Sequence, residues 1–362
     1  MPNDTPFTFT NTRVIAVGIS NGGGAVLRAA ELNAGAPGEN WLAAVVAGEP
    51  TVYVRGGRPL YDYITQAALL MPCALLDMQG LAQSPLSASA RALGAMRCTS
   101  LATAGALQGA DTPAQAASAH KLLRDSGWSD ASLRVGALSV EFDLWRAVAV
   151  TYASAYGRYR VGEHPCGYRF PAANQDGEPR AATAAERATW WSDGSGIPPG
   201  SGVNIIDGKS ALPDPTLPGL QCLRALWDGQ GADAERVRKG IAATVASLPH
   251  KGLPVIVIHG TDDGLVPPRF TSAPYVAMAQ AAGRDVRYWQ VRNAQHFDAF
   301  LALPDYGARY LPLLPYVYAA LDQVWAHLDD ATIPLPSDAV IATVPRAGKP
   351  LALALENLAI PH

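Results

Sequence analysis

The sequence has few charged residues and no long hydrophobic run. Only 16% of its 362 residues are charged, and the formal net charge is −3. This balance is untypical of nucleic-acid-binding proteins, which carry a basic face, and of disordered acidic tails. No apolar stretch reaches the roughly 18 residues that a membrane-spanning helix needs. We therefore expect neither a nucleic acid nor a membrane as a partner.

Several metal and cofactor motifs are also missing. The sequence holds no H-E-x-x-H, EF-hand or P-loop pattern, and its four cysteines form no C-x-x-C pair. We therefore expect no metal and no cofactor. Either two disulfides in an oxidising compartment or four buried thiols would account for these cysteines, which are Cys73, Cys98, Cys166 and Cys222. The first eleven residues carry neither the basic nor the apolar region of a signal peptide, so cytoplasmic, periplasmic and secreted locations all stay open.

Short β-branched runs predict the strands of a parallel sheet. Arg13–Val17 stops at Gly18, a helix pattern follows over Gly22–Leu32, and Trp41–Ala47 reads as a second buried strand. Strand, glycine turn, helix and strand form a βαβ unit, which implies parallel pairing. Strand patterns return at Pro254–Ile258 and Asp285–Val291. We therefore predict an α/β fold.

A long segment between these strands has a different, mainly helical character. Helix patterns lie at Asp62–Leu70, Pro113–Asp125, Ser139–Tyr156, Ala232–Ala246, Ser272–Ala282 and Leu311–Leu328. A loop-rich stretch over Pro165–Pro218 contains Trp190 and Trp191, which are candidates to line a substrate pocket or to anchor packing. We predict an α/β core from residues 1–50 and 251–335, a helical lid insertion over 51–250, and an extended C-terminal arm over 336–362.

The segment Gly18-Ile19-Ser20-Asn21-Gly22 is a G-x-S-x-G placed between a strand and a helix. A nucleophile on this sharp turn has a strained backbone, and its neighbours must be small for the turn to close. The turn exposes the Ser20 hydroxyl and directs the Asn21 backbone N–H, at the helix N-terminus, toward a developing oxyanion. We predict Ser20 as the nucleophile and Asn21 as an oxyanion donor.

An acid and a base follow downstream in the order expected for such a turn. Asp262 and Asp263 come directly after the strand at Pro254–Ile258, and His296 follows the next strand. We predict His296 as the base and Asp263 as its orienting acid, with Asp262 as the second choice. For His259 the sequence favours turn packing over support of the site.

A dinucleotide-binding fold is the main alternative for the same turn. Glu49 ends the second strand where a ribose-binding acid would lie. The fingerprint requires G-x-G-x-x-G, however, and Ser20 occupies the position of its second glycine. We therefore interpret Glu49 as a polar residue at the rim of the sheet, facing the active site.

Three segments together resemble the bacterial D-(−)-3-hydroxybutyrate oligomer hydrolases. They are V-G-I-S-N-G-G-G-A-V-L-R-A-A-E (Val17 to Glu31), H-G-T-D-D-G-L-V-P-P-R (His259 to Arg269) and N-A-Q-H-F-D (Asn293 to Asp298). The resemblance implies an α/β-hydrolase serine esterase that converts short 3-hydroxybutyrate oligomers to monomer through an acyl-enzyme on Ser20. Its partner would be a small-molecule ester. A more distant similarity is to tannase and feruloyl esterase, but many of those enzymes carry Cys where this sequence has Ile19 and Phe297.

The position of Ser20 leaves room for only one strand before the nucleophile. An α/β-hydrolase has several strands there, and one of their loops supplies the second oxyanion donor. Members of the resembling family are about twice as long, with the extra length before the serine. We therefore expect a C-terminal portion of a longer enzyme, a mis-started reading frame, or a partner chain that supplies the strands. Alone, the chain should be aggregation-prone and weakly active or inactive, so a non-catalytic binding fragment is the other function class.

Overall fold

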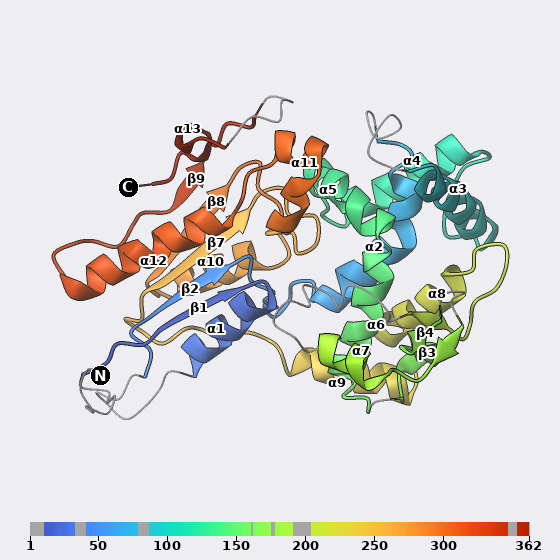
Figure 1. The fold of residues 1–362 in the computed structure, drawn as a ribbon, viewed down its shortest axis with the longest axis horizontal. Helices are drawn as coiled ribbons and strands as arrows, with labels where there is room; N and C mark the ends of the chain where they lie inside the picture. Colours follow the sequence, from blue (N-terminus) through green and yellow to red (C-terminus); the bar gives the residue numbers. More distant parts are fainter. Residues whose placement is uncertain are drawn as a thin grey trace.

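The computed structural model describes residues 11–32, 41–78, 87–160, 162–174, 178–190, 204–346 and 353–361. Figure 1 shows a sheet with its helices in one part of the molecule and a larger group of helices beside it. The helices of the second part lie between the second and third strands of the sheet along the chain. The two parts have largely separate hydrophobic cores, which are joined where Phe270 packs into the helical core and where Val135 and Leu138 contact Tyr306 and Tyr310.

A five-stranded parallel sheet forms the first part. Its strands are ordered β1 (Ile15–Ile19), β2 (Ala44–Gly48), β7 (Val255–Gly260), β8 (Val286–Val291) and β9 (Ala339–Ile341). The central strands β2 and β7 are buried at every residue, because helices cover both faces of the sheet. The prediction of an α/β fold with a parallel sheet is confirmed.

Three helices cover the sheet. Helices α1 (Asn21–Glu31) and α10 (Ser272–Ala281) pack on one face, around Val45, Val255 and Tyr275. Helix α12 (Leu314–Asp329) packs on the other face, around Val46 and Trp289. Alternate residues of each strand thus enter different cores, as the pleat of a strand requires.

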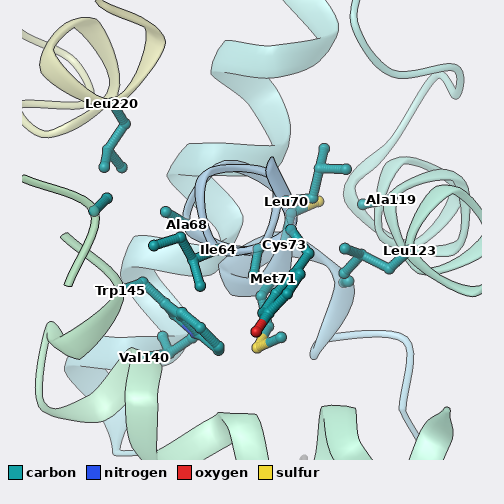
Figure 2. Packing of buried hydrophobic residues seen from close by; sticks show 14 of the residues in the cluster. Ile64, Ala68, Leu70, Met71, Cys73, Ala119, Leu123, Val140, Trp145 and Leu220 are labelled. Carbon is teal, nitrogen blue, oxygen red and sulfur yellow. The ribbon is translucent and has the colours of Figure 1, made fainter. Parts of the chain in front are cut away.

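The helical part is built around α2 (Leu60–Ala74), of which nearly every residue is buried. A helix that is apolar on all sides must be covered on all sides. Figure 2 shows Ile64, Met71 and Cys73 of α2 among side chains of the surrounding helices. These helices are α3 (Ala88–Thr103), α4 (Thr112–Asp125), α5 (Asp130–Glu141), α6 (Leu144–Tyr156) and α8 (Leu217–Asp228).

Smaller elements complete the described chain. They are η1 (Pro165–Gly167), β3 (Tyr168–Arg169), β4 (Ala172–Ala173), β5 (Pro179–Arg180), α7 (Ala184–Trp190), β6 (Ile206–Asp207), α9 (Ala232–Ala242), η2 (Asp298–Ala302), α11 (Pro304–Arg309) and α13 (Leu355–Leu358). Strands β3 and β6 pair with each other, as do β4 and β5. Trp191 and the side chain of Trp190 lie outside the described residues, so their predicted pocket role stays a prediction.

Two helix predictions are corrected. The pattern over Ser139–Tyr156 predicted one helix, but the structure has a break between α5 and α6. Asp143 causes the break because its φ of 52° is left-handed and cannot continue a right-handed helix. The predicted helix over Ala232–Ala246 ends at Ala242.

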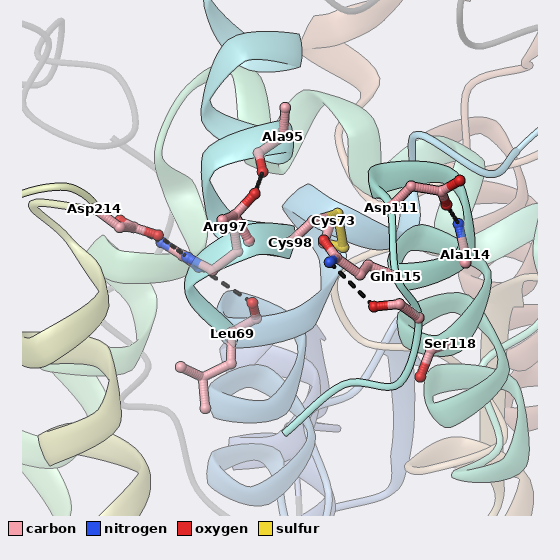
Figure 3. The surroundings of a disulfide bond; sticks show 12 residues. Leu69, Cys73, Ala95, Arg97, Cys98, Asp111, Ala114, Gln115, Ser118 and Asp214 are labelled. Carbon is pink, nitrogen blue, oxygen red and sulfur yellow. Dashed lines mark hydrogen bonds and ion pairs between the residues drawn. A yellow bond between two sulfur atoms is a disulfide. The ribbon is translucent and has the colours of Figure 1, made fainter. Parts of the chain in front are cut away.

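The four cysteines form two disulfides, Cys73–Cys98 and Cys166–Cys222. The first joins α2 to α3, and the second joins η1 to α8, so both lie within the helical part. Next to the first, the buried guanidinium of Arg97 pairs with Asp214 and donates to the Leu69 carbonyl (Figure 3). Of the two alternatives for the cysteines, two disulfides or four buried thiols, the structure shows the two disulfides.

The C-terminal segment is more than an extended arm. Its β9 adds a fifth parallel strand beside β8, and Leu358 of α13 is buried against α12. The Tyr316 hydroxyl donates to the Leu358 carbonyl at 2.5 Å. A three-residue strand among prolines has too short a pattern to be recognised in the sequence.

None of the helices that the structure describes combines the length and the apolar character needed to cross a membrane.

Candidate active site

The carboxyl ends of four neighbouring strands bring the polar residues of the site together. Ser20 follows β1, Glu49 follows β2, and Asp263 and His296 lie in the loops after β7 and β8. Because all these strands are parallel, their carboxyl ends share one edge of the sheet. Open α/β sheets place ligands at this edge.

The turn at Ser20 is strained and closely packed. Ser20 has φ 56° and ψ −117°, a conformation that residues with side chains rarely adopt. A Cβ on Gly18 would lie 2.2 Å from the Gly22 carbonyl oxygen, and a Cβ on Gly24 would lie 2.1 Å from the Thr51 carbonyl oxygen. A Cβ on Gly22, in contrast, would meet nothing within 4 Å. Closure of the turn therefore requires Gly18 but not the second glycine of the motif, which corrects our expectation for Gly22.

The side chains of Ser20, His296 and Asp263 form a continuous hydrogen-bonded chain. The Ser20 Oγ lies 2.9 Å from His296 Nε2, and His296 Nδ1 lies 2.7 Å from Asp263 Oδ2. Both His296 and Asp263 are buried. The Phe297 ring packs edge-on against the imidazole, with centroids 4.9 Å apart. The structure thus brings together the three residues predicted to act as nucleophile, base and acid.

Asp263 is held as a carboxylate. Its Oδ1 accepts the backbone N–H groups of Leu265 and Val266, at 2.8 Å and 2.7 Å. Burial alone would raise the pKa of Asp263, but His296 and His259 beside it hold that pKa well below its ordinary value. A permanently ionised acid is what a neighbouring imidazolium needs.

Asp262 and His259 have different surroundings from those predicted. The Asp262 carboxylate accepts the Thr261 hydroxyl at 2.8 Å, and no hydrogen bond joins it to His296 among the described residues. His259 is fully buried, and its Nε2 lies 3.2 Å from Asp263 Oδ2 and 2.9 Å from the Val266 carbonyl. His259 therefore supports the acid as well as packing in the turn.

Glu49 faces the same imidazole from the second strand. Its Oε2 lies 3.2 Å from His296 Nδ1, and the residue is only 1% exposed. Burial and the nearby Asp263 and Asp298 carboxylates raise the pKa of Glu49 well above its ordinary value. The raised pKa favours the neutral form of Glu49 beside the ionised Asp263, at the rim position that the sequence indicated.

Asn21 begins α1 directly after Ser20. The first N–H groups of a helix have no carbonyl within the helix to bond, and the helix N-terminus favours negative charge. The Asn21 side-chain oxygen accepts a hydrogen bond from the Tyr152 hydroxyl of α6. A contact between the helical part and the turn thus holds the first residue of α1. Sequence reasoning missed Tyr152, since nothing distinguishes it from other helix tyrosines.

Glu49, Asp263 and His296 are also the one group in the described part of the chain whose donor atoms are close enough to hold a metal ion. His296 Nδ1, however, is hydrogen-bonded to Asp263, and an ion there would displace the shared proton. The group is therefore a pair of acids at one imidazole. This arrangement can move a proton from Ser20 to His296 and stabilise the resulting cation.

Comparison with known proteins gives the chain a family. The family model "3HB-oligomer hydrolase" matches residues 2–362. A Paracidovorax citrulli protein named D-(−)-3-hydroxybutyrate oligomer hydrolase is 37% identical over 95% of this chain and 54% of its own length. Proteins of the same name from Burkholderia pseudomallei and Azoarcus sp. are 37% and 40% identical, over 93% and 86% of this chain.

The chain spans about half the length of these curated relatives, 54%, 52% and 50% in the order given. No solved structure matches the chain. The family model covers nearly every residue, and the relatives align through both the sheet and the helical part. The chain belongs to the 3HB-oligomer hydrolase family.

Proposed function

We propose that this chain carries the machinery of a serine esterase that hydrolyses short 3-hydroxybutyrate oligomers to 3-hydroxybutyrate. The observation that carries the proposal is the hydrogen-bonded chain from Ser20 through His296 to Asp263. The substrate class follows from the names of the relatives, which are D-(−)-3-hydroxybutyrate oligomer hydrolases.

The proposed reaction has two halves. In the first, Ser20 Oγ attacks the ester carbonyl while His296 Nε2 takes its proton, and Asp263 stabilises the imidazolium through Nδ1. His296 then gives the proton to the leaving alcohol, and an acyl group stays on Ser20. In the second half, His296 activates a water that cleaves the acyl-enzyme. The Asn21 N–H stabilises the oxyanion in both halves.

We also propose that the sheet is of the α/β-hydrolase type and that the helical part acts as a lid. Two close contacts support a position over the site. Tyr152 of α6 binds Asn21, and a Cβ on Gly264, next to Asp263, would lie 2.6 Å from the Ser132 carbonyl oxygen of α5. A lid so placed would select the ester by shape.

We further propose that β1 pairs with an additional parallel strand from another segment or chain. Within the described residues β1 pairs only with β2, and the side chains of Val17 and Ile19 are 43% and 39% exposed. An apolar strand with a free edge is a template for pairing. An added strand would also bring the loop that supplies a second oxyanion donor.

A serine-directed fluorophosphonate probe tests the nucleophile. Even with the weak activity expected of the chain alone, we expect the wild-type chain to be labelled, Ser20→Ala to lose the label, and the exposed-site control Ser89→Ala to keep it. Labelling of Ser20→Ala at the wild-type rate, or no labelling of the wild type, would contradict the proposal and favour a non-catalytic binding protein.

Comparison of esters tests the substrate class. We expect the dimer and trimer of 3-hydroxybutyrate to be hydrolysed with higher kcat/KM than p-nitrophenyl butyrate or a gallate ester. Preference for the gallate would instead indicate a tannase-like activity.

A further inference from the structure

The Glu49 carboxyl group occupies an unfavourable place in the described structure. Neither of its oxygens has a hydrogen-bond partner there, although both are fully buried. A buried polar group without a partner costs about 1–3 kcal/mol. The backbone adds to this, because Glu49 has φ 45°, a left-handed value that residues with side chains rarely adopt.

The backbone of Glu49 is nevertheless firmly placed. Its N–H donates to the Ile258 carbonyl of β7 at 2.7 Å, and the preceding Gly48 carbonyl accepts the Ser20 N–H at 2.8 Å. These bonds connect Glu49 to the turn of the nucleophile on one side and to the strand of the acid on the other. The side chain is thereby aimed at the imidazole between them.

Two acids therefore meet at one nitrogen. Asp263 Oδ2 lies 2.7 Å from His296 Nδ1, and Glu49 Oε2 lies 3.2 Å from the same atom. The Asp263 contact is a hydrogen bond, whereas Glu49 is in reach without making one. A small rotation of either side chain would exchange the partner of the Nδ1 proton.

We propose that Glu49 is a second orienting acid for His296, a positioning residue that takes over the Nδ1 contact when Asp263 is removed. The proposal rests on the proposed serine mechanism, in which the Nδ1 proton must be held while Nε2 exchanges protons with Ser20. In this role Glu49 acts through His296, whose Nδ1 its Oε2 approaches to 3.2 Å.

The charges around Glu49 explain why it does not orient His296 while Asp263 is present. In the described part of the chain, three titratable groups face its carboxyl: Asp263 and His296 at the imidazole, and Asp298 of η2. With Asp263 ionised, a second negative charge in the same buried site is unfavourable, so Glu49 keeps its proton. Removal of the Asp263 carboxylate removes that repulsion. Glu49 then releases its proton to solvent when an imidazolium forms beside it, and its carboxylate accepts the Nδ1–H.

Double-mutant kinetics test the proposal. We would compare wild type, Asp263→Ala, Glu49→Gln and the double variant, using p-nitrophenyl butyrate hydrolysis and the rate of Ser20 labelling by the fluorophosphonate. Glutamine keeps the shape of the neutral acid but cannot ionise. We expect Glu49→Gln alone to lower kcat/KM less than about tenfold, Asp263→Ala to lower it about 100-fold, and the double variant about 10⁴-fold, the loss typical of a triad without an acid.

The pH profile separates positioning from mere packing. The residual activity of Asp263→Ala should rise with pH as Glu49 ionises, and this rise should vanish in the double variant. Equal activity and equal pH profiles of Asp263→Ala and the double variant would overturn the proposal. Asp263→Asn, which keeps the volume of the side chain, replaces Asp263→Ala in the same comparison if melting shows that the alanine variant does not fold.

The two proposals fail in different ways. If the wild-type chain is not labelled at Ser20, the serine mechanism itself fails. If the wild type is labelled and Ser20→Ala is not, while Glu49→Gln changes nothing in the Asp263→Ala background, then the serine mechanism stands and only the second acid is wrong.

Discussion

Strained residues gather where the strands meet the site. Ser20, Glu49 and Asn293 have φ values of 56°, 45° and 53° although none is glycine. Each lies just beyond the end of a sheet strand, β1, β2 or β8. Left-handed backbone at residues with side chains costs of order 1–3 kcal/mol each and persists only where the surroundings impose it. These three turns direct Ser20, Glu49 and the loop of His296 toward one point.

The raised pKa of Glu49 predicts a pH-dependent effect on stability. Between the ordinary pKa of 4.5 and the raised folded-state pKa, the folded protein keeps a proton that the unfolded chain has lost. In this pH range the contribution of Glu49 to the free energy of unfolding falls as pH rises, by about 1.4 kcal/mol per pH unit. Glutamine does not ionise, so Glu49→Gln should match the wild type below about pH 4.5 and become more stable above it.

Urea unfolding of the wild type and of Glu49→Gln from pH 4 to pH 8 measures the difference between their free energies of unfolding. Because Asp263 and the other titrating groups are present in both, their pH dependence largely cancels in the comparison. A constant difference between the two free energies over the whole range would show that folding does not raise the pKa of Glu49.

At the scale of single elements, the close packing of α1 against β2 explains why Gly23 and Gly24 are glycines. Gly23 and Gly24 pack against the backbone at the end of β2 and just after it, where their Cβ atoms would lie 2.6 Å from the Gly48 carbonyl oxygen and 2.1 Å from the Thr51 carbonyl oxygen. Real Cβ atoms do not approach so closely. These glycines let α1 lie against β2 and keep Ser20 at the edge of the sheet.

A matched pair of alanine substitutions in α1 tests this account. Gly24→Ala should destabilise the chain by about 1–3 kcal/mol, since the backbone at Thr51 must shift. Gly22→Ala has open space and should be neutral or stabilising by up to about 1 kcal/mol, because alanine has less freedom in the unfolded chain. Denaturant midpoints give both values. Equal destabilisation by the two substitutions would show that the close approach at Thr51 is not what requires glycine.

Elements with strong local patterns were predicted well from the sequence. The strands before Ser20, Asp263 and His296 are apolar runs that end in turn residues, and each lies within three residues of its prediction. The sequence patterns do not predict helices α3 and α8, and they merge the end of α5 with α6. Helix α3 has only five buried residues among sixteen, and the break at Asp143 depends on one left-handed residue. Such features are set by packing within the helical part more than by periodicity.

At the scale of the molecule, order along the chain was sufficient to indicate the site but not its full set of contacts. Ser20, Asp263 and His296 follow separate strands, so a parallel sheet brings them to one edge. The approach of Glu49 to His296 joins residues 247 positions apart, and its distance depends on the strained turn after β2. The contact of Tyr152 with Asn21 depends on how the helical part docks. Neither of these two contacts produces a pattern in the local sequence.

The free edge of β1 predicts how the isolated chain behaves in solution. Its Val17 lies on the side of the sheet that α12 covers farther along, and the residue is 43% exposed. We expect the isolated chain to self-associate at micromolar concentration, and Val17→Lys to reduce this because a lysine on an edge strand opposes pairing. Trp325→Lys, at an exposed apolar residue of α12, is the control and should leave self-association unchanged. Light scattering after size exclusion measures the mass of each. A monomeric wild type would show that the edge is no pairing surface, and equal reduction by both variants would attribute association to general surface hydrophobicity.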